Sequence, residues 1–193
     1  MKERGDIFLY RPSASRLKDI ISPTGKESAA ATAYMNDILR WTFFGKDEYQ
    51  FSSFWSERGD RLEPAALLEY VKETGIETEK PAKYVFNKEE LCGCYPDGVS
   101  EFGCVEIKCL KKENHQDIIK NGVPAKFKPQ IQGTLLITKK DWIDFIAYNP
   151  GEELYLKRFH RDEDYLSKMI KLLASFNEQL EQKYAQCLAG AGE

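Results

Sequence analysis

A tight turn followed by an apolar strand with two charges at its centre constrains this chain more than any other feature. The stretch from Cys94 to Cys109 reads CYPDGVSEFGCVEIKC. Pro-Asp-Gly favours a turn, because proline fixes φ and glycine tolerates a positive φ. Residues 104–110 then form a short, mostly apolar run that is typical of a buried strand. We therefore expect a hairpin that brings Asp97 close to this strand.

The two charges of the predicted strand lie on one face, because side chains alternate between the two faces of a strand. Glu106 and Lys108 share their face with Cys104 and Leu110. The opposite face is apolar and contains Val105, Ile107 and Cys109. Charges in such a segment are costly unless they are compensated. With Asp97 they form the set of groups that metal-assisted phosphodiester hydrolysis needs, although a turn aspartate beside a surface ion pair is the simpler alternative.

The bulk composition indicates one globular domain spanning residues 1–193. Charged residues make up 31% and hydrophobic residues 42% of the chain, which is ordinary for a globular protein. No apolar run approaches the roughly 20 residues of a membrane span, and the first residues, MKERGDIFLY, lack the apolar stretch of a secretory signal. We therefore expect no membrane partner and a cytoplasmic location.

The net charge of −3 argues against a generally basic surface that would bind nucleic acid. The distribution of charge is more favourable, because a group of lysines begins within the predicted strand and continues after it. These are Lys108, Lys111, Lys112, Lys120, Lys126 and Lys128. They could form a local groove wall or an ordinary solvated surface.

The cysteines, histidines and tryptophans do not predict a second site. Five cysteines are an odd number, which argues against a disulfide framework. Four of them cluster between positions 92 and 109, but they form no C-x2-C pair, so we expect small buried side chains rather than zinc or iron–sulfur ligands. His115 and His160 are expected at the surface. The three tryptophans are expected in the core.

Hydrophobic periodicity and turn residues predict an α/β protein built around one mixed sheet. A short helix follows Ser13 as its N-cap. Longer helices are expected at 29–44, 57–74, 124–138 and 162–188. Strands are expected at 83–87, 91–95, 104–110, 142–148 and 153–160.

The turn and strand together resemble the signature of the PD-(D/E)xK nuclease superfamily, with Pro96-Asp97 followed by Glu106-x-Lys108. Three further blocks resemble the lambda-type phage recombination exonucleases, an alkaline-exonuclease-like branch of that superfamily. WSERGDRLEPAALLEYVKETG resembles their Arg-Gly-x-x-x-Glu-x-x-Ala-x-x-x-Tyr helix, and FKPQIQGTLLITKKDWIDFIAYNP resembles their glutamine-containing helix and following strand. RPSASRLKDI resembles their Ser/Thr-Ala-Ser helix start. The blocks occur in the family's order and cover most of the chain.

The resemblance implies a restriction-endonuclease-like core, in which a central mixed β-sheet is flanked by helices. It also implies a Mg²⁺-dependent exonuclease that degrades one strand of linear double-stranded DNA from the 5′ end and leaves 3′ overhangs. Such enzymes work with a single-strand annealing protein in phage or prophage recombination, and they often form homo-oligomeric rings, of which trimers are best known.

The resemblance also assigns roles to individual residues. Asp97, Glu106 and the carbonyl of Ile107 are expected to bind metal. The catalytic set consists of Lys108, Asp97, Glu106, Glu63 and Gln130. Candidate DNA contacts are Ser15, Arg16, Arg58, Lys111, Lys112, Lys126 and Lys128.

The expected chemistry agrees with these residue types. Mg²⁺ prefers oxygen ligands and is usually held by one or two carboxylates with water and substrate phosphate. Two ions roughly 3.5–4 Å apart can stabilise both the attacking and the leaving oxygen, and we expect Mn²⁺ to substitute. Lys108 could deprotonate the attacking water or stabilise charge in the transition state, and the sequence does not choose between these roles.

The chain departs from the family pattern at the pocket that holds a 5′-phosphate. The best-known member has a serine directly before the Pro-Asp pair, where this chain has Tyr95, and an arginine well before the Ser/Thr-Ala-Ser block, near which only Arg4 or Arg11 lies here. A preference for 5′-phosphorylated ends is therefore open. Two other functions also stay open: another nuclease of the superfamily, such as an endonuclease or an iron–sulfur type, and a catalytically idle subunit that binds DNA ends.

Overall fold

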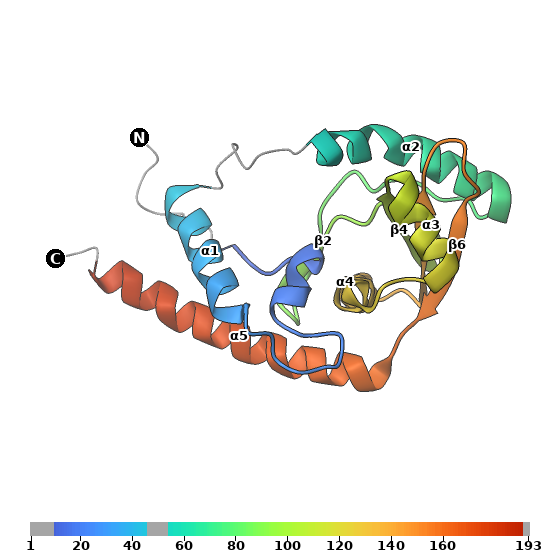
Figure 1. Cartoon of the computed structure of the whole chain (residues 1–193). Coiled ribbons are helices and arrows are strands. Elements are labelled where there is room, and N and C mark those ends of the chain that lie inside the picture. Colours follow the sequence, from blue (N-terminus) through green and yellow to red (C-terminus); the bar gives the residue numbers. More distant parts are fainter. Residues whose placement is uncertain (1–9, 46–53, 191–193) are drawn as a thin grey trace.

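The computed structural model describes residues 10–45 and 54–190, with the side chains of 54–56 left out (Figure 1). The helices are η1 (Ala14–Asp19), α1 (Ala31–Phe44), α2 (Phe54–Thr74), α3 (Lys112–Asn121), η2 (Ala125–Phe127), α4 (Lys128–Thr138) and α5 (Glu163–Gly190). The strands are β1 (Val85–Asn87), β2 (Cys92–Cys94), β3 (Gly98–Val99), β4 (Gly103–Cys109), β5 (Trp142–Tyr148) and β6 (Tyr155–His160).

The main sheet is mixed, as predicted, and its strand order is β3-β4-β5-β6. β4 and β5 are parallel, whereas the β3–β4 and β5–β6 pairs are antiparallel. β1 and β2 lie outside this central mixed sheet and form a separate antiparallel pair, which the sequence did not predict. The Pro96-Asp97 turn follows β2 almost at once and redirects the chain, so β3 rather than β2 pairs with β4.

Helices cover both faces of the main sheet. The side chains of β4 alternate between the two faces, so β4 contributes to the core on each of them. On one face, Val105 and Ile107 pack with Ala66 and Tyr70 of α2. On the other face, the core contains side chains from α3, α4 and the sheet: Cys104, Ile118, Ile131, Leu135, Ile143, Phe145 and Ala147. The face of β4 that carries Glu106 is therefore the one that faces α4.

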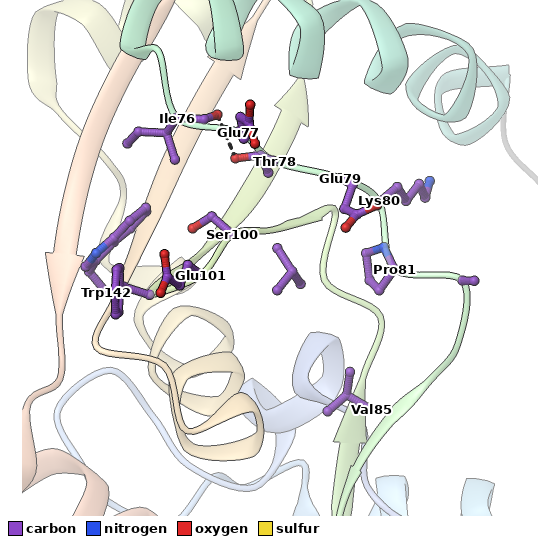
Figure 2. Close-up of a pocket in the computed structure, with 13 residues that line it drawn as sticks. Ile76, Glu77, Thr78, Glu79, Lys80, Pro81, Val85, Ser100, Glu101 and Trp142 are labelled. Carbon is purple, nitrogen blue, oxygen red and sulfur yellow. Dashed lines mark hydrogen bonds between the residues drawn. The ribbon is translucent and has the colours of Figure 1, made fainter.

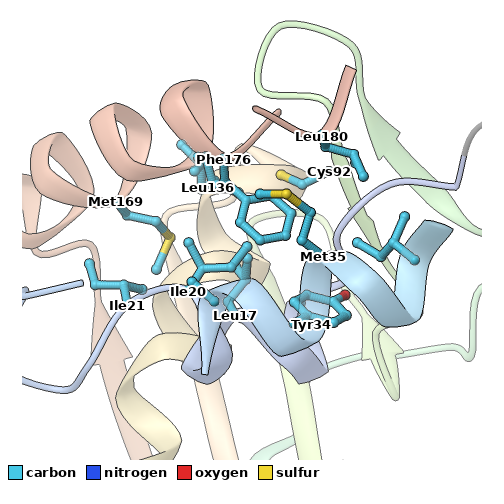
Figure 3. Packing of buried hydrophobic residues seen from close by; sticks show 14 of the residues in the cluster. Leu17, Ile20, Ile21, Tyr34, Met35, Cys92, Leu136, Met169, Phe176 and Leu180 are labelled. Atoms are coloured by element: carbon cyan, nitrogen blue, oxygen red, sulfur yellow. The ribbon is translucent and has the colours of Figure 1, made fainter. Parts of the chain in front are cut away.

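A second part of the core joins the N-terminal region to the long C-terminal helix α5. α5 runs along the opposite side of the molecule from α2, and α4 lies between α5 and the sheet (Figure 1). Leu17, Tyr34, Met169 and Phe176 belong to this cluster (Figure 3). A Cβ atom on Gly133 would lie 2.2 Å from Cδ1 of Leu17, so glycine allows η1 to pack directly on α4. This contact fixes the position of α4 beside the β4 strand.

Most predicted elements are confirmed with small changes at their ends, but one helix was missed. Residues 112–121 form α3, in which most side chains are polar or charged and only His115 and Ile118 are buried. The few buried positions gave no clear helical pattern in the sequence. The prediction of a surface position for His115 was therefore wrong, since its side chain is buried and its Nε2 lies 3.2 Å from the carbonyl oxygen of Ala147. His160 is exposed, as predicted.

The remaining predictions for single residue types are mostly confirmed. Trp41 is a core residue, Trp142 is half-buried, and the side chain of Trp55 lies outside the described residues. Cys92, Cys94 and Cys104 are buried thiols without disulfides, distributed over two hydrophobic clusters. Within the described ranges, no helix combines the length and the apolar character that crossing a membrane requires.

Candidate active site

Asp97 lies beside β4 because the chain reverses after β3, at residues 100–103, and β3 pairs with that strand. Gly98 pairs with Val105 in the hairpin, which places Asp97 next to the centre of β4. The backbone N–H of Ile107 donates a 2.7 Å hydrogen bond to Oδ2 of Asp97. The predicted hairpin that brings Asp97 close to this strand is thus confirmed, but its turn lies at residues 100–103 and not at the Pro-Asp-Gly sequence.

Glu106 is the buried centre of the site, with a residue exposure of only 4%. It forms an ion pair with Lys108, two residues further along the same face of β4. Nε2 of Gln130, in the first turn of α4, donates a 2.6 Å hydrogen bond to Oε1 of Glu106. The structure therefore brings together Asp97, Glu106, Lys108 and Gln130. The turn and strand residues had already predicted the first three as neighbours, whereas Gln130 was expected only from the family resemblance.

The charges of this cluster change the proton affinity of its members. Burial raises the pKa of Asp97 to about 7, and the negative charge of Glu106 adds to this effect. For Lys108, burial opposes the charged form, but the charge and hydrogen bond of Glu106 outweigh burial, so the pKa of Lys108 is raised. At neutral pH Lys108 is therefore protonated, and about half of the Asp97 carboxyl groups keep their proton.

Glu63 lies close to this cluster but makes its strongest contact elsewhere. Nζ of Lys80 donates a 2.6 Å hydrogen bond to Oε2 of Glu63. The charge of Glu63 also contributes to the raised pKa values of Asp97 and Lys108, and Glu63 borders the same 360 Å³ cavity as Asp97. Sequence reasoning missed Lys80, since nothing local connects it to a helix 17 positions earlier.

The oxygen ligands of this site, which are two carboxylates and a backbone carbonyl, fit Mg²⁺ better than a metal that takes all of its ligands from the protein. In the described part of the chain, no three Asp, Glu, His or Cys side chains form a ready-made metal site. Mg²⁺ needs only one or two carboxylates and completes its shell with water and phosphate. Asp97 and Glu106, with the carbonyl of Ile107, would hold the ion, and their mutual repulsion would be relieved by a cation.

Arg58 connects three elements at the edge of the site. Its guanidinium donates to the carbonyl oxygens of Cys109 at 3.5 Å and Leu110 at 3.2 Å. It also donates a 3.0 Å hydrogen bond to Oδ1 of Asn149, just after β5. These hydrogen bonds hold the start of α2 against the ends of β4 and β5. The sequence contained both partners of the Arg58–Asn149 contact within recognised motifs, since Arg-Gly and Asn-Pro occur in two of the blocks that resemble the family.

Several other predicted DNA contacts already have acidic partners in this structure. Lys112 pairs with Glu152 at 2.6 Å, and Lys128 pairs with Asp162 at 2.8 Å. Arg16 forms an ion pair with Asp19 and lies 3.3 Å from Asp37.

The other three predicted DNA contacts lie on exposed surface around the site. Nζ of Lys126 lies 5.2 Å from the ring centre of Phe127, and Lys111 directly precedes α3. The hydroxyl group of Ser15 is 3.2 Å from that of Ser13.

Two larger cavities differ in their distance from the carboxylates. A cavity of about 700 Å³ reaches Glu106 and Gln130, and half of its other lining residues are aromatic. A cavity of about 1260 Å³ lies between the segment after α2 and the β3–β4 turn (Figure 2). Its charged lining consists of Glu77, Glu79, Glu101 and Lys80. Lys80 is already paired with Glu63, so the three glutamates would repel phosphate. The aromatic cavity is therefore the one that can take part in chemistry at Glu106.

Comparison with solved structures shows similarity over almost the whole chain. LHK-Exo, an alkaline exonuclease from Laribacter hongkongensis, matches with a TM-score of 0.84 and 25% identity over 95% of this chain and 94% of that chain. LHK-Exo in complex with dAMP matches with a TM-score of 0.84 and 26% identity over the same shares of both chains.

A more distant structure shows the fold alone. A phage-related exonuclease from Haemophilus somnus 129PT has a TM-score of 0.70 and 15% identity, over 94% of this chain and 98% of that chain. No curated protein sequence matches this chain.

These similarities confirm the resemblance to alkaline exonucleases of the lambda type that the motifs predicted, and they confirm the mixed sheet flanked by helices. The sequence pattern of the YqaJ-like viral recombinase domain matches residues 6–141, which is well over half of the chain. The chain therefore belongs to the family of YqaJ-like viral recombinase domains.

Proposed function

We propose that this protein is a Mg²⁺-dependent exonuclease that degrades one strand of linear double-stranded DNA from the 5′ end. The product would be DNA with 3′ single-stranded overhangs, the substrate of recombination by strand annealing. The observation that carries the proposal is the convergence of Asp97, Glu106, Lys108 and Gln130 at the centre of β4. Its fold relative LHK-Exo is an alkaline exonuclease that has been captured with dAMP, a nucleotide of the kind that stepwise DNA degradation releases.

Each residue of the centre would have a separate task. Mg²⁺, when bound, would supply positive charge for the phosphate and would activate water. Asp97 and Glu106 would hold the ion, and Gln130 would fix the orientation of Glu106 through its 2.6 Å hydrogen bond. Because the pKa of Lys108 is raised, its ammonium group would stay charged and stabilise the negative charge that builds up on the phosphate. This favours the electrostatic role of Lys108 over the role of a general base.

The direct test is degradation of linear duplex DNA in Mg²⁺ by the wild type and by Lys108→Ala. We expect Lys108→Ala to lower the rate by about 10²–10³-fold, the loss typical of a group that stabilises transition-state charge. Lys171→Ala, which changes an exposed lysine on α5, is the matched control and should keep the wild-type rate. Wild-type activity in Lys108→Ala would refute the proposed centre.

A closed-circular duplex separates this proposal from an endonuclease of the same superfamily. An exonuclease needs an end, so the circle should stay intact while the same DNA, once linearised, is degraded. Labels on the 5′ and 3′ ends report the direction, because a 5′-directed enzyme releases the 5′ label first. Cleavage of the circle would replace the exonuclease with an endonuclease.

We also propose that the protein works as a homo-oligomeric ring, with a trimer favoured, together with a single-strand annealing protein in the bacterial cytoplasm. A ring would keep a subunit of net charge −3 on DNA, because only its inner surface needs positive potential. Light scattering tests the ring directly, and a strict monomer would rule it out.

A further inference from the structure

The aromatic cavity beside the active centre is bordered by several exposed aromatic side chains. It has a volume of about 700 Å³, which is within the range of about 300–1,000 Å³ that is usual for ligand sites. Glu106 and Gln130 form one side. Six rings contribute to the rest of its lining: Tyr10, Tyr34, Trp41, Tyr84, Phe86 and Tyr95.

Four of these rings are exposed to solvent although they surround a cavity. Six Phe and Tyr side chains are exposed in the described ranges, and Tyr10, Tyr84, Phe86 and Tyr95 are four of them. Tyr95 is the most exposed of the four, at 69%. Apolar surface that gathers around a hollow and stays uncovered marks a binding site more often than a structural core.

Tyr84 and Tyr95 form a wall that is fixed by the backbone beneath it. Their ring centres are 4.8 Å apart and their planes are inclined by 52°. A Cβ atom on Gly93 would lie 2.3–2.5 Å from the Tyr84 ring, so this ring lies directly on the backbone of β2. Tyr95 directly follows β2 and is two residues before Asp97 in the sequence, so its position is tied to that of the proposed metal ligand.

The charges around the cavity favour a nucleobase over a phosphate group. Arg11 is the one cationic side chain among the described residues that line it. Its guanidinium donates hydrogen bonds to Oε1 of Glu181 at 2.6 Å and to Oδ1 of Asn177 at 3.3 Å. Every base has a flat π-face that can stack on an aromatic ring, whatever its sequence.

We propose that this cavity binds the base of the terminal nucleotide of the strand being degraded, stacked against the Tyr84–Tyr95 wall. The inference rests on the proposed exonuclease function and adds to it the group by which the strand end is recognised. Stacking would position the first phosphodiester at Asp97 and Glu106 without a charged contact to the end. The protein would therefore degrade ends that carry a 5′-hydroxyl group.

The test compares two linear duplexes with 5′-hydroxyl ends that differ only in the terminal nucleotide, which is either normal or abasic. Stacking predicts that the wild type has a KM about tenfold higher for the abasic end, and that Tyr95→Ala reduces this difference to less than about twofold. Tyr95→Phe should keep the difference, because it keeps the ring. Phe102→Ala, which removes an exposed ring that borders the acidic cavity, is the matched control and should behave as the wild type.

A second measurement reports stacking without cleavage. A duplex with 2-aminopurine at its 5′ end, mixed with protein in EDTA, should lose fluorescence with the wild type and Tyr95→Phe but not with Tyr95→Ala. Equal KM values for both ends, or quenching that survives in Tyr95→Ala, would overturn the stacking site. Failure of the proposed function looks different: the wild type would degrade neither duplex, and the fluorescence result would still decide whether the base is bound.

Discussion

The raised pKa of Asp97 predicts that Mg²⁺ binding depends on pH in the neutral range. In the metal-free protein this pKa is about 7, because of burial and the nearby charge of Glu106. In the unfolded chain an aspartate titrates near pH 3.9. The folded state therefore holds its proton more tightly, so the stability contributed by Asp97 is present below about pH 4 and is lost as pH rises to about 7. A bound cation should reverse this trend, since it favours the charged carboxylate.

The size of the effect follows from the fraction of Asp97 that is deprotonated. With a pKa of about 7, roughly one molecule in eleven has the ionised carboxylate at pH 6, and about ten in eleven have it at pH 8. Because Mg²⁺ needs the ionised form, its Kd should rise about tenfold from pH 8 to pH 6, which corresponds to about 1.4 kcal/mol. Binding at pH 6 should release about one proton per site.

Isothermal titration calorimetry measures both quantities. Titrations of Mg²⁺ at pH 6 and pH 8 give the two Kd values, and buffers of different ionisation enthalpy give the number of protons released. Asp97→Asn should remove the proton release and most of the binding, whereas Asp141→Asn, a change at an exposed aspartate, should have no effect. The reasoning fails if Kd is the same at both pH values, or if Asp97→Asn binds Mg²⁺ as the wild type does.

Three further predictions concern one hydrogen bond of the centre and two contacts of the main sheet. Gln130→Ala removes the 2.6 Å hydrogen bond to Glu106 and should weaken Mg²⁺ binding about 10–100-fold, measured by the same titration. Asp144→Ala removes a fully buried carboxylate that forms a 2.7 Å ion pair with Arg158. Urea denaturation should show that the free energy of unfolding falls by roughly 2–4 kcal/mol. This value allows for solvent screening, because 38% of the Arg158 side chain is exposed. Gly103→Ala places a Cβ atom 2.3 Å from the Trp142 ring and should cost about 1–3 kcal/mol, whereas unchanged stability would contradict this packing.

Local chemistry was sufficient to predict the pair of charges on β4 and the position of Asp97. A strand repeats every two residues, so Glu106 and Lys108 had to share a face wherever the strand was placed. The Pro-Asp-Gly sequence then predicted a turn directly before the segment that pairs with β4, although the hairpin itself reverses at residues 100–103. Neither step depends on distant parts of the chain, and this is why both could be made from sequence.

Contacts between distant elements could not be predicted in the same way. The hydrogen bond from Gln130 to Glu106 depends on the position of α4, which is fixed in part by the packing of Leu17 on Gly133. The pairing of Lys80 with Glu63 depends on the path of the loop after α2. The helix α3 was missed because its exposed charges outnumber the two residues that it buries, His115 and Ile118.

The pairing of cations explains how an acidic chain can contain this active centre. Lys112 and Lys128 are engaged by acidic partners, so they do not form a wall of unpaired charge along a groove in a single chain. Such exposed pairs are weak and are easily exchanged for phosphate at low salt. Under the proposed function, attraction at the centre itself would come from Lys108 and from a Mg²⁺ ion that neutralises Asp97 and Glu106. Binding of the strand end by stacking on Tyr95 would add affinity for DNA that salt does not screen. This contribution would matter for a subunit of net charge −3, because its overall electrostatic attraction to DNA is weak.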